Sequence, residues 1–146
     1  MKRGVILVFS AMLLFAVGCA NNGTSVKGNL SNAEGETVVL ERLSSTAATT
    51  VDSVEVGAKG EFKLSAGEIA EPGFYRLRID QNNFVILLLE NGENVEVTGN
   101  VLDFYRSYEI TGSEGSVKLR SLDQRLRADY EKTDSLRKSF QAFQQA

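Results

Sequence analysis

Histidine is absent from this 146-residue chain, and cysteine occurs once, as Cys19. Without histidine the chain has no Ser-His-Asp or Cys-His nucleophile, no general base of the commonest kind, and no imidazole ligand for zinc. One cysteine leaves no CxxC pair for redox chemistry within the chain. Carboxylate pairs, Ser-Lys dyads and tyrosine acids remain, but Asp, Glu, Lys and Ser are ordinary surface residues. We therefore expect a protein that is not an enzyme and uses no cofactor.

The N-terminus predicts export and a lipid anchor. Lys2 and Arg3 precede an apolar run that is too short to cross a bilayer comfortably. The run ends in Ala16-Val17-Gly18-Cys19, which resembles the lipobox of bacterial lipoproteins. The resemblance implies that residues 1–18 are a signal peptide and that Cys19 is the lipidated N-terminus. An ordinary signal peptide with an incidental cysteine is the alternative.

The charge and the tether restrict the partners and the location. Loss of residues 1–18 leaves 14 of the 16 basic side chains against 19 acidic ones, a formal charge of -5. Such a chain is a poor candidate for nucleic acid and gains little from anionic lipids beyond its anchor. Residues 19–24 predict a lipidated tether, and no acidic cluster follows Cys19. We expect a lipid-anchored protein of the bacterial cell envelope, in the outer membrane and facing the periplasm.

Residues 25–112 predict a mainly β domain. Around Tyr75 the sequence alternates, so that Tyr75, Leu77 and Ile79 share one face while Arg76 and Arg78 take the other. Similar short runs recur every eight to twelve residues or so without an intervening helix. The pattern predicts an antiparallel β-sandwich or open barrel of about seven to eight strands, and we favour the sandwich.

Residues 84–98 predict a hairpin. An apolar run over 84–90 is followed by Asn91-Gly92 and then by an alternating run over 93–98. Asn-Gly tolerates the positive φ that a two-residue type I′ turn requires at both central positions. The first strand is apolar on both faces, so we expect it to be covered on both sides.

Three groups of side chains have the chemistry of ligand sites, but a structural role explains each of them. Arg76 and Arg78 suit an anion, but we expect a solvated strand face. Four oxygen-bearing residues near the hairpin suit a hard cation, but their spacing matches no EF-hand, so we expect no metal site. A set of aromatic side chains suits a sugar-binding surface, although core packing explains most of them. The oxygen-bearing residues are Glu90, Asn91, Glu93 and Asn94, and the aromatic residues are Phe74, Tyr75, Phe104, Tyr105 and Tyr108.

Residues 113–146 predict one long amphipathic helix, with Ser113 or Ser116 as its N-cap. Apolar residues recur at alternating steps of three and four and form one stripe, interrupted at Asp129 and Thr133. The stripe must pack against the sandwich, a second copy or another domain, so we expect it to dock a partner. The helical pattern runs to the last residue, as in an interrupted module. The docking residues are Leu119, Leu122, Leu126, Leu136, Phe140 and Phe143.

The order of strands and turns resembles a known module. It is similar to the domain of unknown function that precedes the thioredoxin-like domain in lipid-anchored thiol:disulfide oxidoreductases of Gram-negative bacteria. The resemblance covers residues 24–146 and implies a β-sandwich accessory domain at a membrane. It carries over no catalytic residue, because the downstream CxxC pair is missing here. The runs that carry it include Val26-Lys27-Gly28-Asn29-Leu30, Gly60-Glu61-Phe62-Lys63-Leu64, Pro72-Gly73-Phe74-Tyr75-Arg76-Leu77 and Thr111-Gly112-Ser113.

Three functions are compatible with these features. The first is a non-catalytic envelope lipoprotein module that binds or positions a protein partner, such as a redox or envelope protein. The second is the N-terminal accessory part of a truncated or split thiol:disulfide oxidoreductase. The third is a glycan- or lipid-binding sandwich, which a cluster of exposed aromatic residues would favour. The sequence predicts no oligomeric state.

Overall fold

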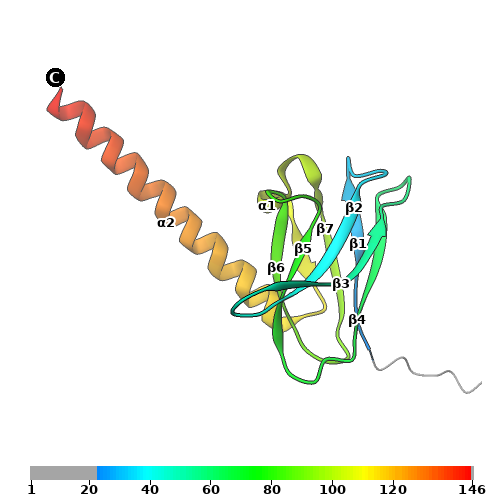
Figure 1. The fold of residues 1–146 in the computed structure, drawn as a ribbon. Helices are drawn as coiled ribbons and strands as arrows, with labels where there is room; N and C mark the ends of the chain where they lie inside the picture. The colour runs from blue at the N-terminus through cyan, green and yellow to red at the C-terminus, as the bar shows by residue number, and fades with distance from the viewer. Residues whose placement is uncertain (1–22, 146) are drawn as a thin grey trace, which may run out of the picture.

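A computed structural model describes residues 23–145 of the chain. In this part of the chain, eight strands form two four-stranded sheets, and one long helix follows them (Figure 1). The prediction of a mainly β sandwich with a C-terminal helix is therefore confirmed. The signal peptide and the lipidation of Cys19 lie outside the described residues.

Each sheet draws its strands from distant parts of the chain. The first sheet has the order β4-β1-β7-β8 and the second has the order β3-β2-β5-β6. The first contains β1 (Thr24–Ser31), β4 (Glu61–Gly67), β7 (Asn94–Asn100) and β8 (Glu109–Thr111). The second contains β2 (Thr37–Leu43), β3 (Ala48–Glu55), β5 (Gly73–Arg78) and β6 (Phe84–Leu89). Between β7 and β8 lie a 3₁₀ turn, η1 (Val101–Asp103), and a short helix, α1 (Phe104–Ser107).

One strand pair departs from the antiparallel pattern. β1 and β7 run parallel, with Val26 opposite Val95 and Gly28 opposite Val97, whereas the other pairs are antiparallel. The two backbones approach so closely that a Cβ atom at Gly28 would lie 1.6 Å from the carbonyl oxygen of Val97. Only glycine fits at this position of β1.

The predicted hairpin over residues 84–98 is wrong. β6 and β7 belong to different sheets, so the Asn91-Gly92 turn carries the chain from one sheet to the other. Gly92 has a φ of 78°, but Asn91 is not among the residues with positive φ, so the turn is not type I′. The Asn91 side chain instead accepts a hydrogen bond from the Ile69 amide at 3.0 Å. The hydroxyl of Thr24 holds both ends of the turn, donating to the Glu90 carbonyl and accepting from the Gly92 amide.

The core lies between the two sheets and consists of alternate side chains from most strands. Tyr75, Leu77, Val95 and Val97 are buried there, as their alternation predicted. The side chains of β6 are apolar on both faces, and they point in turn into the core and toward an outer face that is half-buried. The buried face of β6 is Val85, Leu87 and Leu89, and the half-buried face is Phe84, Ile86 and Leu88.

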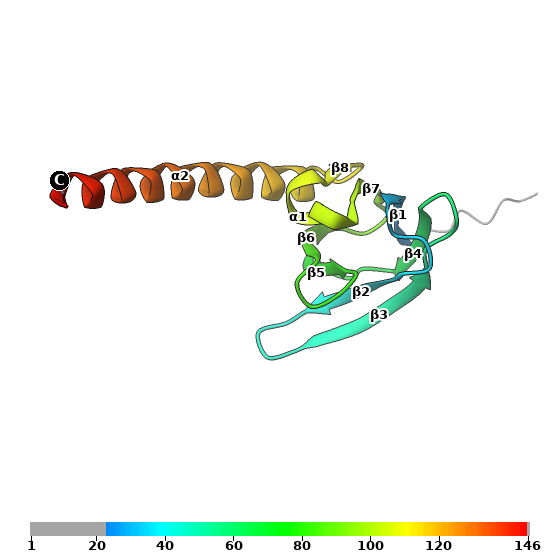
Figure 2. The ribbon, with the colours of Figure 1, turned by 90° about the horizontal axis from the view of Figure 1, so that it is seen from above.

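The long helix α2 (Glu114–Gln144) begins against the sandwich and then projects away from it (Figure 1, Figure 2). Its first turns pack on β6 and β8, each of which is an edge strand of its sheet. Ser113 is the N-cap, because its hydroxyl accepts a hydrogen bond from the Ser116 amide. No helix among residues 23–145 is both long enough and apolar enough to span a bilayer.

Candidate binding surface

Two serines attach the start of α2 to the edge of the second sheet. The Ser116 hydroxyl donates to the carbonyl of Leu88 at 2.9 Å and accepts from its amide at 3.0 Å. The Ser113 hydroxyl donates to the same carbonyl at 3.0 Å. These bonds satisfy backbone groups that an edge strand leaves open. The N-terminus of α2 therefore covers the outer edge of β6.

Polar contacts with the segment around α1 set the direction in which α2 leaves. Arg120 donates to the Tyr108 carbonyl at 2.6 Å and forms an ion pair with Glu109 at 2.7 Å. One turn further on, Asp123 accepts a hydrogen bond from the Tyr105 hydroxyl at 2.7 Å. Arg127 pairs with Asp123 at 2.8 Å and lies over the ring of Tyr105, 3.8 Å from its centroid.

The pKa values of two tyrosines at this contact are raised. The hydrogen bond to the Asp123 carboxylate, with partial burial, raises the pKa of Tyr105 above its ordinary value of 10.0. Burial raises the pKa of Tyr108 in the same direction. Both phenols are therefore neutral at pH 7.

The docking residues that the sequence predicted have two different environments. Leu119, nearest the sandwich, is half-buried. Beyond Leu119 the large apolar side chains of the stripe are more than half open to solvent. The exposed fractions are 53% for Leu122, 60% for Leu126, 64% for Leu136, 62% for Phe140 and 80% for Phe143. We call Leu119 and these five residues the α2 stripe.

A groove continues the α2 stripe onto the sandwich. It has a volume of about 410 Å³ and lies between the outer face of β6, α1 and the second and third turns of α2. The sequence analysis did not predict that β6 lines a groove, although the apolar residues on both faces of that strand pointed to a covered outer face. The lining residues are Asn82, Phe84, Ile86, Tyr105, Tyr108, Leu119 and Asp123.

The two arginines of β5 are paired within the fold. The Glu41 side chain lies between them, and its carboxylate accepts from Arg76 at 2.7 Å and from Arg78 at 2.8 Å. Burial raises the pKa of Glu41, but the hydrogen bonds from Arg78 and Arg76 and their charges outweigh burial, so the pKa lies below its ordinary value. The arginines are therefore half-buried partners of a buried carboxylate, rather than the solvated face that we expected or an anion site. Glu41 was missed, although it directly follows the apolar run over residues 38–40.

The oxygen-bearing residues near the Asn91-Gly92 turn also bond within the fold. Asn94 accepts a hydrogen bond from the Ser25 hydroxyl at 2.9 Å, and Glu93 accepts one from the Glu90 amide at 3.0 Å. Within residues 23–145 no three acidic, histidine or cysteine side chains gather in a way that could hold a metal ion.

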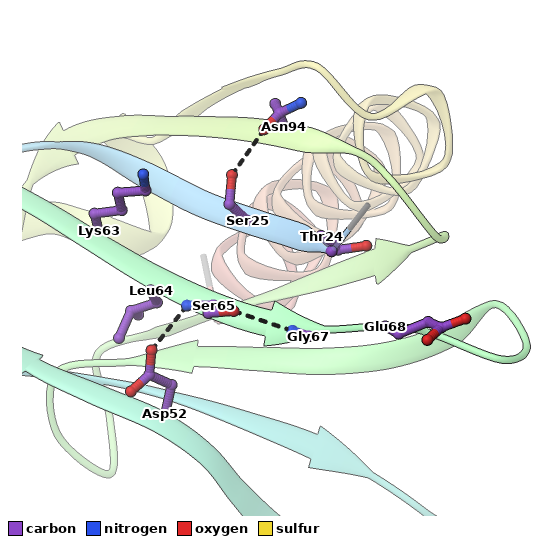
Figure 3. A pocket seen from close by; sticks show the side chains of 10 residues that line it. Thr24, Ser25, Asp52, Lys63, Leu64, Ser65, Gly67, Glu68 and Asn94 are labelled. Carbon is purple, nitrogen blue, oxygen red and sulfur yellow. Dashed lines mark hydrogen bonds between the residues drawn. The ribbon is translucent and has the colours of Figure 1, made fainter. Parts of the chain in front are cut away.

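A polar hollow of about 540 Å³ is lined by residues of β1 and β4, by Asp52 from the middle of β3 and by Asn94 at the start of β7 (Figure 3). Asp52 accepts from the Ser65 amide at 2.8 Å, and the Ser65 hydroxyl accepts from the Gly67 amide at 3.2 Å. In the described part of the chain no hydrogen bond joins Lys63 to Ser25 or Ser65, so the hollow contains no Ser-Lys dyad. The bond from Ser65 to Asp52 links β4 to β3.

The aromatic residues considered for sugar binding divide between core and surface. Tyr75, Phe104 and Tyr108 are buried, which confirms core packing for them. Phe74 and Tyr105 are 50% and 44% exposed. Phe74 belongs to β5, whereas Tyr105 lies on α1 in the groove.

A known protein family matches the part of the chain that contains the sandwich. The DUF4369 family, described as a domain of unknown function, matches residues 24–119, from the first residue of β1 into the second turn of α2. This chain belongs to the DUF4369 family. Most of the α2 stripe therefore lies beyond the matched DUF4369 domain, with only Leu119 inside it. No curated protein sequence matches the chain.

Solved structures that are similar to the DUF4369 chain include two at 14% identity. A crystal structure of (S)-allantoin synthase aligns with a TM-score of 0.41 over 65% of this chain and 45% of that protein. A structure of Klebsiella pneumoniae 5-hydroxyisourate hydrolase aligns with a TM-score of 0.39 over 64% of this chain and 99% of that protein. This chain thus spans less than half of the synthase.

Proposed function

We propose that this chain is a non-catalytic module of the bacterial cell envelope that binds or positions a protein partner through the α2 stripe. One observation carries the proposal: a projecting helix exposes five large apolar side chains on one stripe, each more than half open to solvent. An exposed apolar stripe of this kind is typical of an interaction site. An amphipathic helix docked through residues three and four apart is a recurring mode of protein recognition.

The attachment of α2 to the sandwich supports the same function. The serine bonds to Leu88 and the Arg120, Asp123 and Arg127 contacts hold the first turns. The helix therefore presents its stripe at a defined angle instead of swinging on a flexible linker. A held helix loses less conformational entropy when a partner binds.

The sequence pattern at the N-terminus supports a location in the envelope. We propose that Cys19 is lipidated and that the chain is anchored in the outer membrane, facing the periplasm, where redox and envelope proteins are the partners within reach. Labelling with a radioactive fatty acid tests the anchor. Label is expected in the native chain and not in Cys19→Ala, and equal labelling of both chains would contradict the anchor.

The binding function is tested by cross-linking in membranes that contain the full chain. A photoreactive amino acid at position 125, beside the α2 stripe, is expected to give cross-linked protein products. Leu136→Glu in the same chain should remove these products, because it places a charge in the stripe. Leu102→Glu is the matched control, since Leu102 is 78% exposed outside the helix. Products that survive Leu136→Glu would contradict the role of the stripe.

A second candidate function rests on the order of strands and turns over residues 24–146 and on its resemblance to an accessory module. We propose, as the alternative, that the chain is the N-terminal accessory part of a truncated or split thiol:disulfide oxidoreductase, as the sequence resemblance implies. Reading the DNA beyond codon 146 tests it. A reading frame that encodes a CxxC pair is the expected result, and its absence would overturn this alternative.

A further inference from the structure

We propose that the partner of the α2 stripe is a second copy of this chain, and that the two α2 helices pack antiparallel. This inference rests on the proposed function, because it names the protein that the stripe binds. It follows from the spacing of the stripe, from the identity of the residues that interrupt it, and from the distribution of charge between helix and sandwich.

The α2 stripe has the spacing of a coiled-coil seam. From Leu119 to Phe143 its positions alternate strictly between steps of three and four residues, which repeats every seven. A seven-residue repeat keeps a seam facing one partner helix along its length. At 1.5 Å per residue the seam is about 36 Å long. Its positions are Leu119, Leu122, Leu126, Asp129, Thr133, Leu136, Phe140 and Phe143.

The seam is symmetric about its midpoint at residue 131. When a second helix runs in the opposite direction and is centred there, every layer joins residues of the same character. The three apolar layers on each side contain large side chains from both helices, and the polar residues meet only each other. The layers are Leu119 with Phe143, Leu122 with Phe140, Leu126 with Leu136, and Asp129 with Thr133.

The polar positions decide the direction of the pair. In a parallel dimer the two Asp129 carboxylates would meet in one layer, where like charges repel. In the antiparallel dimer each carboxylate faces Thr133 of the second copy. The Thr133 hydroxyl now donates to the Asp129 carbonyl of its own helix at 2.8 Å, and it would turn to donate to the facing carboxylate instead.

Charge and helix dipoles favour the same direction. α2 has seven basic and five acidic side chains, whereas residues 24–113 have seven basic and 14 acidic ones. The last ten residues of α2 include Arg137 and Lys138 and no acidic side chain, and antiparallel packing brings this end of each helix beside the negative sandwich of the other copy. It also places helix ends of opposite dipole sign side by side. The two Lys132 ammoniums flank the symmetry axis, but they are exposed, so salt screens their repulsion.

The groove beside β6 receives the C-terminal end of the α2 helix of the second copy. Because Leu119 lines the groove and forms a layer with Phe143 of the second copy, the distal aromatic residues of one helix enter the groove of the other. Phe84 and Ile86 of β6 supply its apolar wall. The sandwich thereby contributes to the interface, and the half-buried outer face of β6 is covered.

Engineered cysteines test the geometry in the full chain carrying Cys19→Ser, purified in a mild detergent. Leu126→Cys and Leu136→Cys together are expected to give a covalent dimer with a short bifunctional maleimide. Neither substitution alone should do so. In the antiparallel pair, a cysteine at one of these positions lies ten residues along the axis from the same cysteine of the second copy, which is about 15 Å. Dimer from either single variant would indicate parallel helices and overturn the proposal.

Sedimentation of the same full chain measures the association itself. The parent chain is expected to sediment as a dimer, Leu136→Glu as a monomer, and Leu102→Glu as a dimer. A parent chain that is monomeric at all concentrations would overturn the self-association, whether or not it binds vesicles of anionic lipid. If photocross-links at position 125 then join α2 to a different protein, the proposed function stands and only the dimer fails. If no protein is joined, both fail.

Discussion

Replacing Ser116 by alanine tests whether the edge of β6 holds α2 in place. Ser116 is fully buried and bonds to both the amide and the carbonyl of Leu88. In Ser116→Ala the carbonyl keeps Ser113, but the amide loses its partner, which costs about 1–3 kcal/mol. Alanine returns about 0.5 kcal/mol through its higher helix propensity. The free energy of unfolding should therefore fall by about 1–2 kcal/mol.

The assay is chemical and thermal unfolding followed by circular dichroism. A loss of this size lowers the melting temperature of a domain of this length by about 4–8 °C. Ser135→Ala is the matched control, because Ser135 is exposed on the same helix. Hydrogen exchange at the Leu88 amide should also become faster in Ser116→Ala, since that amide becomes open to water. Equal stability of the two variants, with unchanged exchange at Leu88, would refute the reasoning.

Three further predictions concern the sandwich and the α2 stripe. Hydrogen bonds from two arginines lower the pKa of Glu41, so its stabilising contribution is present above about pH 4.5 and is lost as the pH falls through the lower folded-state value. Glu41→Gln should lower the free energy of unfolding by about 1–3 kcal/mol at pH 7 and by less at pH 3, as measured by denaturant titration; an equal loss at both would contradict the pairing. Gly28→Ala should prevent β1 and β7 from pairing, because its Cβ would overlap the Val97 carbonyl, and a melting temperature within 2 °C or so of the parent would exclude that close approach. Phe140→Trp introduces the only tryptophan of the chain, and its emission should shift to the blue as protein concentration rises if α2 self-associates, whereas a shift caused only by added vesicles would indicate a lipid surface.

Local patterns predicted the strands and the helix but not all of the strand partners. The alternation at Tyr75, Leu77 and Ile79 identifies β5, because side chains of a strand point to opposite faces in turn. The Asn91-Gly92 pair suggested a hairpin for an equally local reason. β7 instead pairs with β1, whose residues are about 70 positions away, so competition from a distant strand overrode the turn preference.

The partners of charged residues could not be read from the sequence for the same reason. Glu41 is separated from Arg76 and Arg78 by 35 and 37 positions, and only the β2–β5 register brings them together. Alternation identified the polar face of β5 but contained no information about the strand beside it. Only the fold therefore shows that Arg76 and Arg78 are paired with Glu41.

The sequence by itself determined the β-rich domain, the position of the helix and the α2 stripe, because each depends on residues within a few positions of one another. Tertiary structure decided which strands meet, and it decided which part of the stripe is covered. Leu119 and Leu126 have the same place in the seven-residue pattern, yet Leu119 lines a groove and Leu126 is 60% exposed. The physical reason is that α2 leaves the sandwich after its contacts with the α1 segment, so the same pattern faces protein at one end and solvent at the other.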